Sequence, residues 1–196
     1  MEGHLSQLKM IRVNSTFLDY IVTLKNSSYG ELITEKQAEF GEKIIEQKTN
    51  VRYVFLIKEG LAKCYLTEDT GEDFIQEFFG KGEVFGEIEL ITNNISFCTI
   101  EALTPTTYFK IPKRVFHDLI KKDEAFNTQI LELMAGKVRY TALRHSYNQT
   151  HSIEEILKSL LLQYPDLLKL ISKKDISNYL GITVRSLNRV LKTVIP

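Results

Sequence analysis

Residues 173–191 read KKDISNYLGITVRSLNRVL, and this stretch predicts two short helices joined by a tight turn. Ser172, with Asp175 three residues later, suits the cap of the first helix, and Thr183 suits the cap of the second. Gly181 lies between them, where the turn requires a positive φ, and the small Ser177 falls where the helices would cross. Two capped helices at this spacing indicate a helix-turn-helix. Its buried apolar positions are expected at Ile176, Leu180, Ile182, Leu187 and Val190.

The second of these helices is expected from Val184 to Lys192, with its outer faces turned away from Leu187 and Val190. Arg185 and Arg189 are four residues apart and share one face, and a guanidinium can donate two hydrogen bonds to guanine O6 and N7. The pattern predicts a helix that reads a major groove. The alternative is a helical hairpin whose arginines are only solvated. The expected DNA contacts are Thr183, Val184, Arg185, Ser186, Asn188, Arg189 and Lys192.

The distribution of charge favours a nucleic-acid partner for this end of the chain. The whole sequence has 25 basic and 25 acidic residues and no net charge. From Ser152 onward there are seven basic and four acidic residues, so this region carries +3 and the rest of the chain −3. A local basic surface is what DNA binding needs.

The apolar spacing from Glu124 to Tyr147 predicts one long helix with two apolar faces. Phe126, Ile130 and Leu133 form the face expected to pack on the N-terminal half. Because a helix with one apolar face docks only once, a second face requires a second partner, which we expect to be another copy of the chain. The alternative is a helix held between two domains of one monomer. The expected dimer-interface residues are Leu131, Met134, Val138 and Ala142.

The polar stretch 145–152 is expected to be a hinge, followed by a capping box of Ser152 and Glu155 and a helix over Ile153–Leu162. Before the long helix, from about Leu32 to Lys110, apolar runs alternate with turn residues at intervals of roughly ten residues, as in an all-β sandwich or barrel. The expected strands are Lys43–Glu46, Tyr53–Lys58, Leu61–Leu66, Phe74–Phe79, Phe97–Ala102 and Thr107–Ile111.

Residues 55–60 (FLIKEG), Gly71 and above all residues 82–88 (GEVFGEI) resemble the β-roll of the Crp/Fnr regulators. The resemblance covers about Phe40 to Leu191, and residues 86–91 are most similar to the YeiL-like branch. It implies an α+β fold with an N-terminal β-roll of the jelly-roll type (a double-stranded β-helix, like the cyclic nucleotide-binding domain), a long dimerisation helix and a C-terminal winged helix-turn-helix. It also implies a bacterial homodimeric transcription regulator, with RNA polymerase as a partner, whose DNA affinity changes when an effector binds the roll.

The expected domains are an effector-type β-roll with short N-terminal helices over residues 1–112, a short helix plus the dimerisation helix over 113–147, and the helix-turn-helix over 148–196. Family members continue past the recognition helix into a β-hairpin wing, which is missing here because the sequence stops at Pro196. We therefore expect either a truncated chain or weakened DNA binding, since a helix of about nine residues with nothing after it loses packing and phosphate contacts.

Family members that bind cyclic nucleotides pair the Gly-Glu of this motif, whose Glu holds the ribose 2′-hydroxyl, with an Arg about ten residues later that neutralises the phosphate. Gly86 and Glu87 match the first half, but no Lys or Arg occurs from Gly82 to Phe109. A buried phosphate would therefore lack its charge partner. We expect an unknown small-molecule effector, and not cyclic AMP, in a pocket formed by Gly86, Glu87, Ile88, Phe97, Cys98 and Thr99.

The composition argues against the other classes of site. No His lies between His4 and His117, so a cupin-type metalloenzyme or a histidine-ligated metal inside the roll is not expected, and Cys64 and Cys98 alone cannot hold a four-cysteine cluster. We expect no catalytic residue, no metal and no cofactor. The lack of a signal peptide predicts a cytoplasmic protein with no membrane partner. The rival function is an effector-binding or protein-interaction module whose helix-turn-helix does not bind DNA.

Overall fold

The computed structural model describes residues 8–194. Within this range the chain forms two compact units. One comprises Ile11–Ile130, and the other comprises the residues from Leu131 onward together with Leu8–Met10. The units divide inside the long helix, whereas the domain limits expected from sequence follow the ends of elements and stay a prediction.

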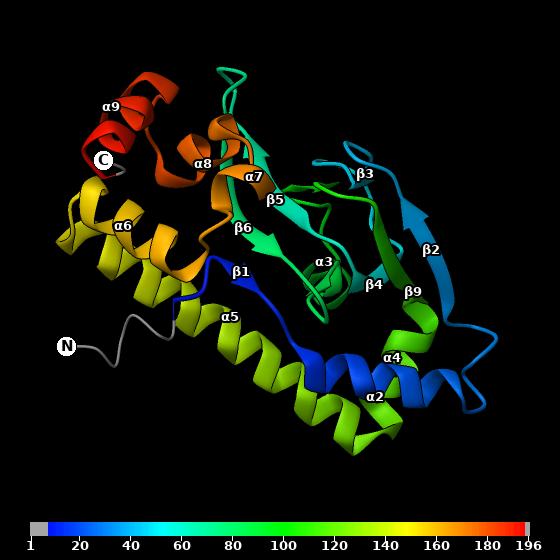
Figure 1. The fold of residues 1–196 in the computed structure, drawn as a ribbon. Helices are drawn as coiled ribbons and strands as arrows, with labels where there is room; N and C mark the ends of the chain where they lie inside the picture. Colours follow the sequence, from blue (N-terminus) through cyan, green and yellow to red (C-terminus); the bar gives the residue numbers. More distant parts are fainter. Residues whose placement is uncertain (1–7, 195–196) are drawn as a thin grey trace. The chain divides into compact units, whose positions relative to one another are not determined.

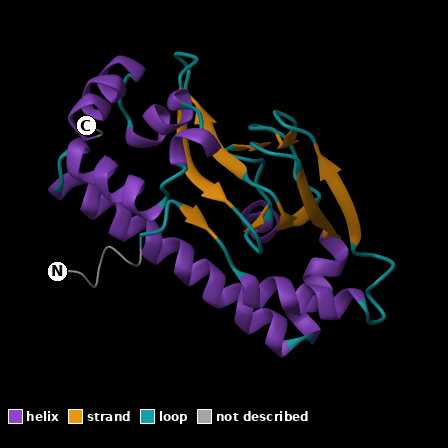
Figure 2. Ribbon diagram, in the orientation of Figure 1, coloured by secondary structure: helices purple, strands orange, loops and turns teal. Residues whose placement is uncertain are grey.

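The unit formed by Ile11–Ile130 contains two β-sheets (Figures 1 and 2). The first has the strand order β1-β6-β5-β8-β3, and the second has the order β2-β9-β4-β7. Apart from β1, which runs parallel to β6, neighbouring strands are antiparallel. The strands are β1 (Ile11–Arg12), β2 (Thr34–Ala38), β3 (Lys43–Ile45), β4 (Tyr53–Glu59), β5 (Ala62–Thr67), β6 (Asp73–Phe79), β7 (Val84–Phe85), β8 (Thr99–Ala102) and β9 (Thr106–Pro112).

The six strands expected from sequence are present as β3, β4, β5, β6, β8 and β9, each with ends within two residues of the expected ones. Three further strands were not expected. β1 and β7 have two residues each, too few for a period-2 pattern. β2 reads TEKQA, and only Ala38 is buried, because this strand lies at the edge of its sheet.

An aromatic cluster fills the interior of the roll. The Phe55 and Phe85 rings stack with centroids 5.3 Å apart, Phe79 stacks on Phe85 at 5.9 Å, and Tyr108 meets Phe55 edge-on at 5.8 Å. Both cysteines, Cys64 and Cys98, are buried in this same core. The roll is thus a packed core made by the inward faces of the strands.

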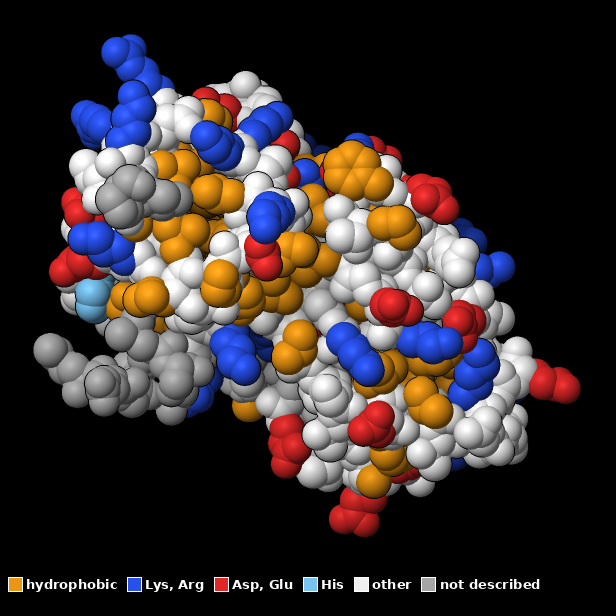
Figure 3. All heavy atoms as spheres, in the orientation of Figure 1, with side chains coloured by type: hydrophobic (Ala, Val, Ile, Leu, Met, Phe, Trp, Pro, Cys, Tyr) orange, Lys and Arg blue, Asp and Glu red, His pale blue; other side chains and the backbone are white. Residues whose placement is uncertain are grey.

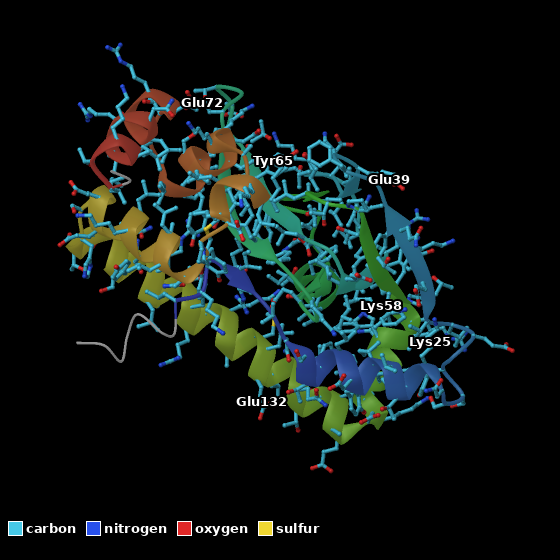
Figure 4. The ribbon with its side chains drawn as sticks, viewed as in Figure 1. Lys25, Glu39, Lys58, Tyr65, Glu72 and Glu132 are labelled. Atoms are coloured by element: carbon cyan, nitrogen blue, oxygen red, sulfur yellow. The ribbon has the colours of Figure 1, made fainter. Side chains whose placement is uncertain are left out.

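Helices cover one end of this unit, where they gather around Phe126. The Phe17 ring of α2 (Ser15–Lys25) and the Phe116 ring of α4 (Lys113–Lys122) lie 5.7 and 5.9 Å from the Phe126 ring. Figure 4 labels Lys25, at the end of α2, and Lys58, on β4. Both donate hydrogen bonds to the Glu35 carboxylate, at 3.3 and 2.8 Å. These two lysines lower the pKa of Glu35, the Lys58 hydrogen bond having the largest effect.

Within the described residues the second unit contains helices and no strand, and Leu8–Met10 are non-helical. It contains the C-terminal part of α5 (Glu124–Thr150) and the helices α6 (Ile153–Gln163), α7 (Leu167–Leu170), α8 (Lys173–Leu180) and α9 (Val184–Val194). The expected hinge over residues 145–152 is wrong in extent, because α5 continues to Thr150. Its last turn is held by the stacking of Tyr147 on His151, with ring centroids 3.9 Å apart. The capping box of Ser152 and Glu155 is confirmed.

Candidate functional sites

The α8–turn–α9 segment has the geometry of a helix-turn-helix. The Asp175 amide donates to Ser172 Oγ at 3.0 Å, and the Ser186 amide donates to Thr183 Oγ1 at 3.1 Å, so both expected caps are confirmed. Gly181 adopts φ +66°, in the left-handed region, and its amide donates to the Ser177 carbonyl. The side chain of Ser177 is buried, as expected at a helix crossing.

The buried face of this motif differs in part from the expected one. Ile176 and Leu187 are fully buried, but Leu180, Ile182 and Val190 are only half-buried. Tyr179 and Leu191, which were not among the expected positions, are buried in this motif. The reason is that α9 packs on α6 as well as on α8, and Leu191, one turn after Leu187, lies on the same face. The helix also extends to Val194, two residues beyond its expected end.

The residues expected to contact DNA remain accessible. Thr183, Val184, Arg185, Arg189 and Lys192 are exposed, and Ser186 and Asn188 are half-buried. Basic side chains gather on the outer side of the α9 region (Figure 3). Sequence reasoning missed Lys173, whose ammonium donates a hydrogen bond to Asn188 Oδ1 at 2.9 Å. The contact joins residues 15 apart on different helices, so no local spacing signals it.

The two apolar faces of α5 have different environments. Phe126, Ile130 and Leu133 are buried, as expected. On the other face Leu131 is 63% and Val138 70% exposed, Ala142 is exposed and Met134 is half-buried. Apolar side chains exposed in a row along one helix face are unusual in a chain that acts alone.

The loop expected to bind an effector is tightly built. Gly86 adopts φ +87°, and a Cβ at this position would lie 2.7 Å from the Tyr53 carbonyl oxygen, so only glycine fits. Glu87 starts α3 (Glu87–Thr92) and is buried, whereas Ile88 is half-buried. The nearby Ser96 hydroxyl lies 3.1 Å from Glu89 Oε1.

The other half of the expected pocket is split between the core and the surface. Cys98 belongs to the aromatic core, and Thr99 is buried, with its Oγ1 accepting a hydrogen bond from the Gln47 amide at 3.1 Å. Phe97, in contrast, is 47% exposed. Of these three expected pocket residues, only Phe97 has its side chain at the surface.

Two further observations concern other classes of site. Among residues 8–194, no group of three or more His, Cys, Asp or Glu side chains is placed to hold a metal ion. No helix in the same range is long and apolar enough to cross a membrane.

Residues 35–123 match the family model of the cyclic nucleotide-binding domain. The chain is 26% identical over 149 residues to the anaerobic regulatory protein of Haemophilus influenzae. The aligned region covers 70% of this chain and 58% of that protein. The chain thus spans less than two thirds of the length of this relative.

Similar solved structures show the same fold. FixK2 from Bradyrhizobium japonicum matches with a TM-score of 0.71 and 20% identity, over 83% of this chain and 84% of that chain. A protein of Eubacterium rectale assigned to the Crp/Fnr transcriptional regulators matches with a TM-score of 0.74 and 19% identity, over 91% and 85% of the two chains. The fold and the matches define a cyclic nucleotide-binding type of β-roll followed by a helix-turn-helix. The chain is similar to regulators of the Crp/Fnr family in its β-roll and in the helices that follow it.

Proposed function

We propose that this chain is a cytoplasmic, homodimeric transcription regulator that binds DNA through α9 and acts with RNA polymerase, with no catalytic activity of its own. The observation that carries the proposal is the pair Arg185 and Arg189, exposed one turn apart on a capped helix whose apolar face is buried. In that arrangement both guanidinium groups are available to base edges and phosphates. The regulators among its relatives support the same role.

The effector is proposed to be a small molecule other than cyclic AMP or cyclic GMP, bound near Gly86–Ile88 and Phe97–Thr99. Two observations support this. No Lys or Arg occurs from Gly82 to Phe109 to meet a phosphate, and the roll interior is occupied by the stacked rings of Phe55, Phe79 and Phe85. An effector must therefore bind at the surface of this loop or displace an aromatic ring.

The proposed DNA binding is tested by gel shift with a pool of random-sequence duplexes at about 50 and 200 mM salt, because phosphate contacts make the affinity fall steeply with salt. The double variant Arg185→Ala/Arg189→Ala should abolish the shift at both concentrations. The matched control is Lys158→Ala/Lys169→Ala, which removes the same charge from exposed ion pairs with Glu154 and Asp166 away from α9.

The control should bind nearly as the unchanged chain, since exposed ion pairs of this kind contribute little. Equal losses in the two double variants would mean that only net charge matters. No shift with the unchanged chain at either salt would overturn the proposal and favour the interaction-module alternative.

A further inference from the structure

The segment Leu8–Asn14, the strap, passes from one compact unit to the other. Its residues Leu8–Met10 belong to the helical unit, and its residues from Ile11 onward belong to the roll. The chain crosses between the units a second time inside α5, between Ile130 and Leu131. Within the described residues the units are therefore connected by two covalent crossings, and α5 is not the only one.

The roll end of the strap is held by its backbone. Ile11 and Arg12 pair in parallel with Phe78 and Phe79 of β6. The Gly80 amide then donates to the Arg12 carbonyl at 2.8 Å, and the Asn14 amide donates to the Lys81 carbonyl at 2.9 Å. A Cβ on Gly82 would collide with the Asn14 carbonyl, so the two backbones are in close contact. The strap thus packs along the turn that leads into the Gly86–Glu87 loop.

Charge reinforces this attachment. The Arg12 guanidinium lies 3.2 Å from Glu77 Oε1 and 3.4 Å from Glu83 Oε1. Glu83 is only 2% exposed and precedes Gly86 by three residues. A buried carboxylate depends strongly on its cation, so any movement of Glu83 alters the position that is favourable for Arg12. The position of Arg12 in the strap therefore depends on the position of Glu83, next to the loop expected to bind the effector.

The other end of the strap lies in the helical unit. Leu8 lines a cavity of about 30 Å³ together with Tyr140 and Arg144 of α5, Ile156 and Leu160 of α6, and Tyr179 of α8. Met10 is fully buried. The cavity has room for about one water molecule, so Leu8 adjoins the place where α5, α6 and α8 meet.

We propose that the strap is a second route, beside α5, by which the state of the Gly80–Glu87 loop reaches the helices that carry the helix-turn-helix. The inference rests on the proposed function, since it names how the effector loop would regulate the DNA-binding unit. Met10, which is fully buried, is bonded directly to the strand residue Ile11. A displacement of Arg12 is therefore passed to Leu8 through the three residues between them, Lys9, Met10 and Ile11.

The test compares hydrogen exchange in two chains without DNA or effector. In the chain without an insertion, Glu83→Gln removes the buried charge that Arg12 contacts. This substitution should accelerate amide exchange in α6 and α8 by about tenfold. In a second chain, Gly-Ser-Gly-Ser inserted between Met10 and Ile11 keeps both attachments but slackens the strap. There the same substitution should still alter exchange in the roll, but the response of α6 and α8 should fall to the part that α5 alone transmits.

The matched control places the same insertion between Asp69 and Thr70, in the exposed turn between β5 and β6. It should leave the response of α6 and α8 unchanged. If Glu83→Gln prevents folding, Glu77→Gln, at the less buried partner of Arg12, serves in its place. An equal response with and without the Met10–Ile11 insertion, or no response in either chain, would overturn the inference. Because no DNA is present, this result is independent of whether the chain binds DNA.

Discussion

The Arg144 guanidinium lies 3.9 Å above the Tyr179 ring and donates a hydrogen bond to the Tyr179 carbonyl oxygen at 2.9 Å. Beside it, the Tyr140 and Tyr179 hydroxyl oxygens are 3.2 Å apart. These contacts attach the last helical turns of α5 to the end of α8, immediately before the Gly181 turn. The helix α5 and the first helix of the helix-turn-helix thus share a specific polar junction.

Arg144→Ala should destabilise the helical unit by about 2 kcal/mol, because it removes a charge-assisted hydrogen bond and a cation–π contact together. Arg144→Lys should recover only part of the loss, since an ammonium does not reproduce the planar stack of a guanidinium. Urea unfolding followed by circular dichroism measures both. Glu132→Ala, at an exposed position of the same helix (Figure 4), is the control and should change stability by less than about 0.5 kcal/mol. A similar loss in that control would assign the effect to α5 as a whole.

Met134→Glu combined with Val138→Glu should convert dimers to monomers in analytical ultracentrifugation. The proposed seam places these side chains against a second copy, and two carboxylates facing their symmetry mates would repel each other in a desolvated interface. Leu162→Glu is the matched control, because Leu162, on α6, is the most exposed large apolar side chain among residues 8–194, at 83%. A dimer that survives the double substitution, or one that Leu162→Glu disrupts, would place the interface elsewhere.

The helix-turn-helix and most strands follow from sequence because their determinants are local. Caps at Ser172 and Thr183, a positive φ at Gly181 and period-2 apolar runs each act within a few residues. The errors arise where tertiary packing decides. Val190 and Leu191 are both apolar, and only the position of α6 determines that Leu191 becomes the buried one. The polar β2 is a strand because β9 offers it hydrogen bonds, which its own sequence does not reveal.

The sites follow the same division. The accessibility of Arg185 and Arg189 follows from helical periodicity alone. The Arg12–Glu83 pair and the Lys173–Asn188 hydrogen bond join residues distant in sequence, so only the fold brings them together. The expected hinge begins at residue 145, before the end of α5 at Thr150, because polar residues also suit an exposed helix. The Tyr147 ring stacks on His151 and so stabilises this end of α5.

Cyclic AMP and cyclic GMP at millimolar concentration should give no saturable heat in titration calorimetry. The region has no cation for the phosphate, and the stacked rings of Phe55 and Phe85 occupy the space inside the roll. A micromolar dissociation constant would contradict the prediction and point to phosphate binding by backbone amides alone.

An arginine placed in this stretch, to supply a positive charge for a phosphate, should have different effects at positions 97 and 98. Phe97→Arg should leave the thermal midpoint nearly unchanged, because this side chain is half exposed. Cys98→Arg should destabilise the roll by about 3 kcal/mol or more, since it would bury a guanidinium in the aromatic core. Titration calorimetry of Phe97→Arg with cyclic AMP then measures whether the added positive charge is enough to permit nucleotide binding. Equal thermal midpoints for the two variants would contradict the burial of Cys98.

Arg185 and Lys192 should have distinguishable roles in DNA binding, because they lie at opposite ends of α9. Arg185 lies in the first turn, the part of a recognition helix that contacts base edges, and Lys192 lies in the last turn. In a homodimer, Arg185→Ala should cost about 1–3 kcal/mol per half-site and relax the preference at one base pair. Lys192→Ala should weaken all sequences about equally and flatten the dependence of affinity on salt, as expected for a phosphate contact. Selection from random duplexes gives the preference, and binding at several salt concentrations gives the slope. If both variants lost affinity equally with unchanged base preference, α9 would not read sequence, and the chain would be better explained as an interaction module.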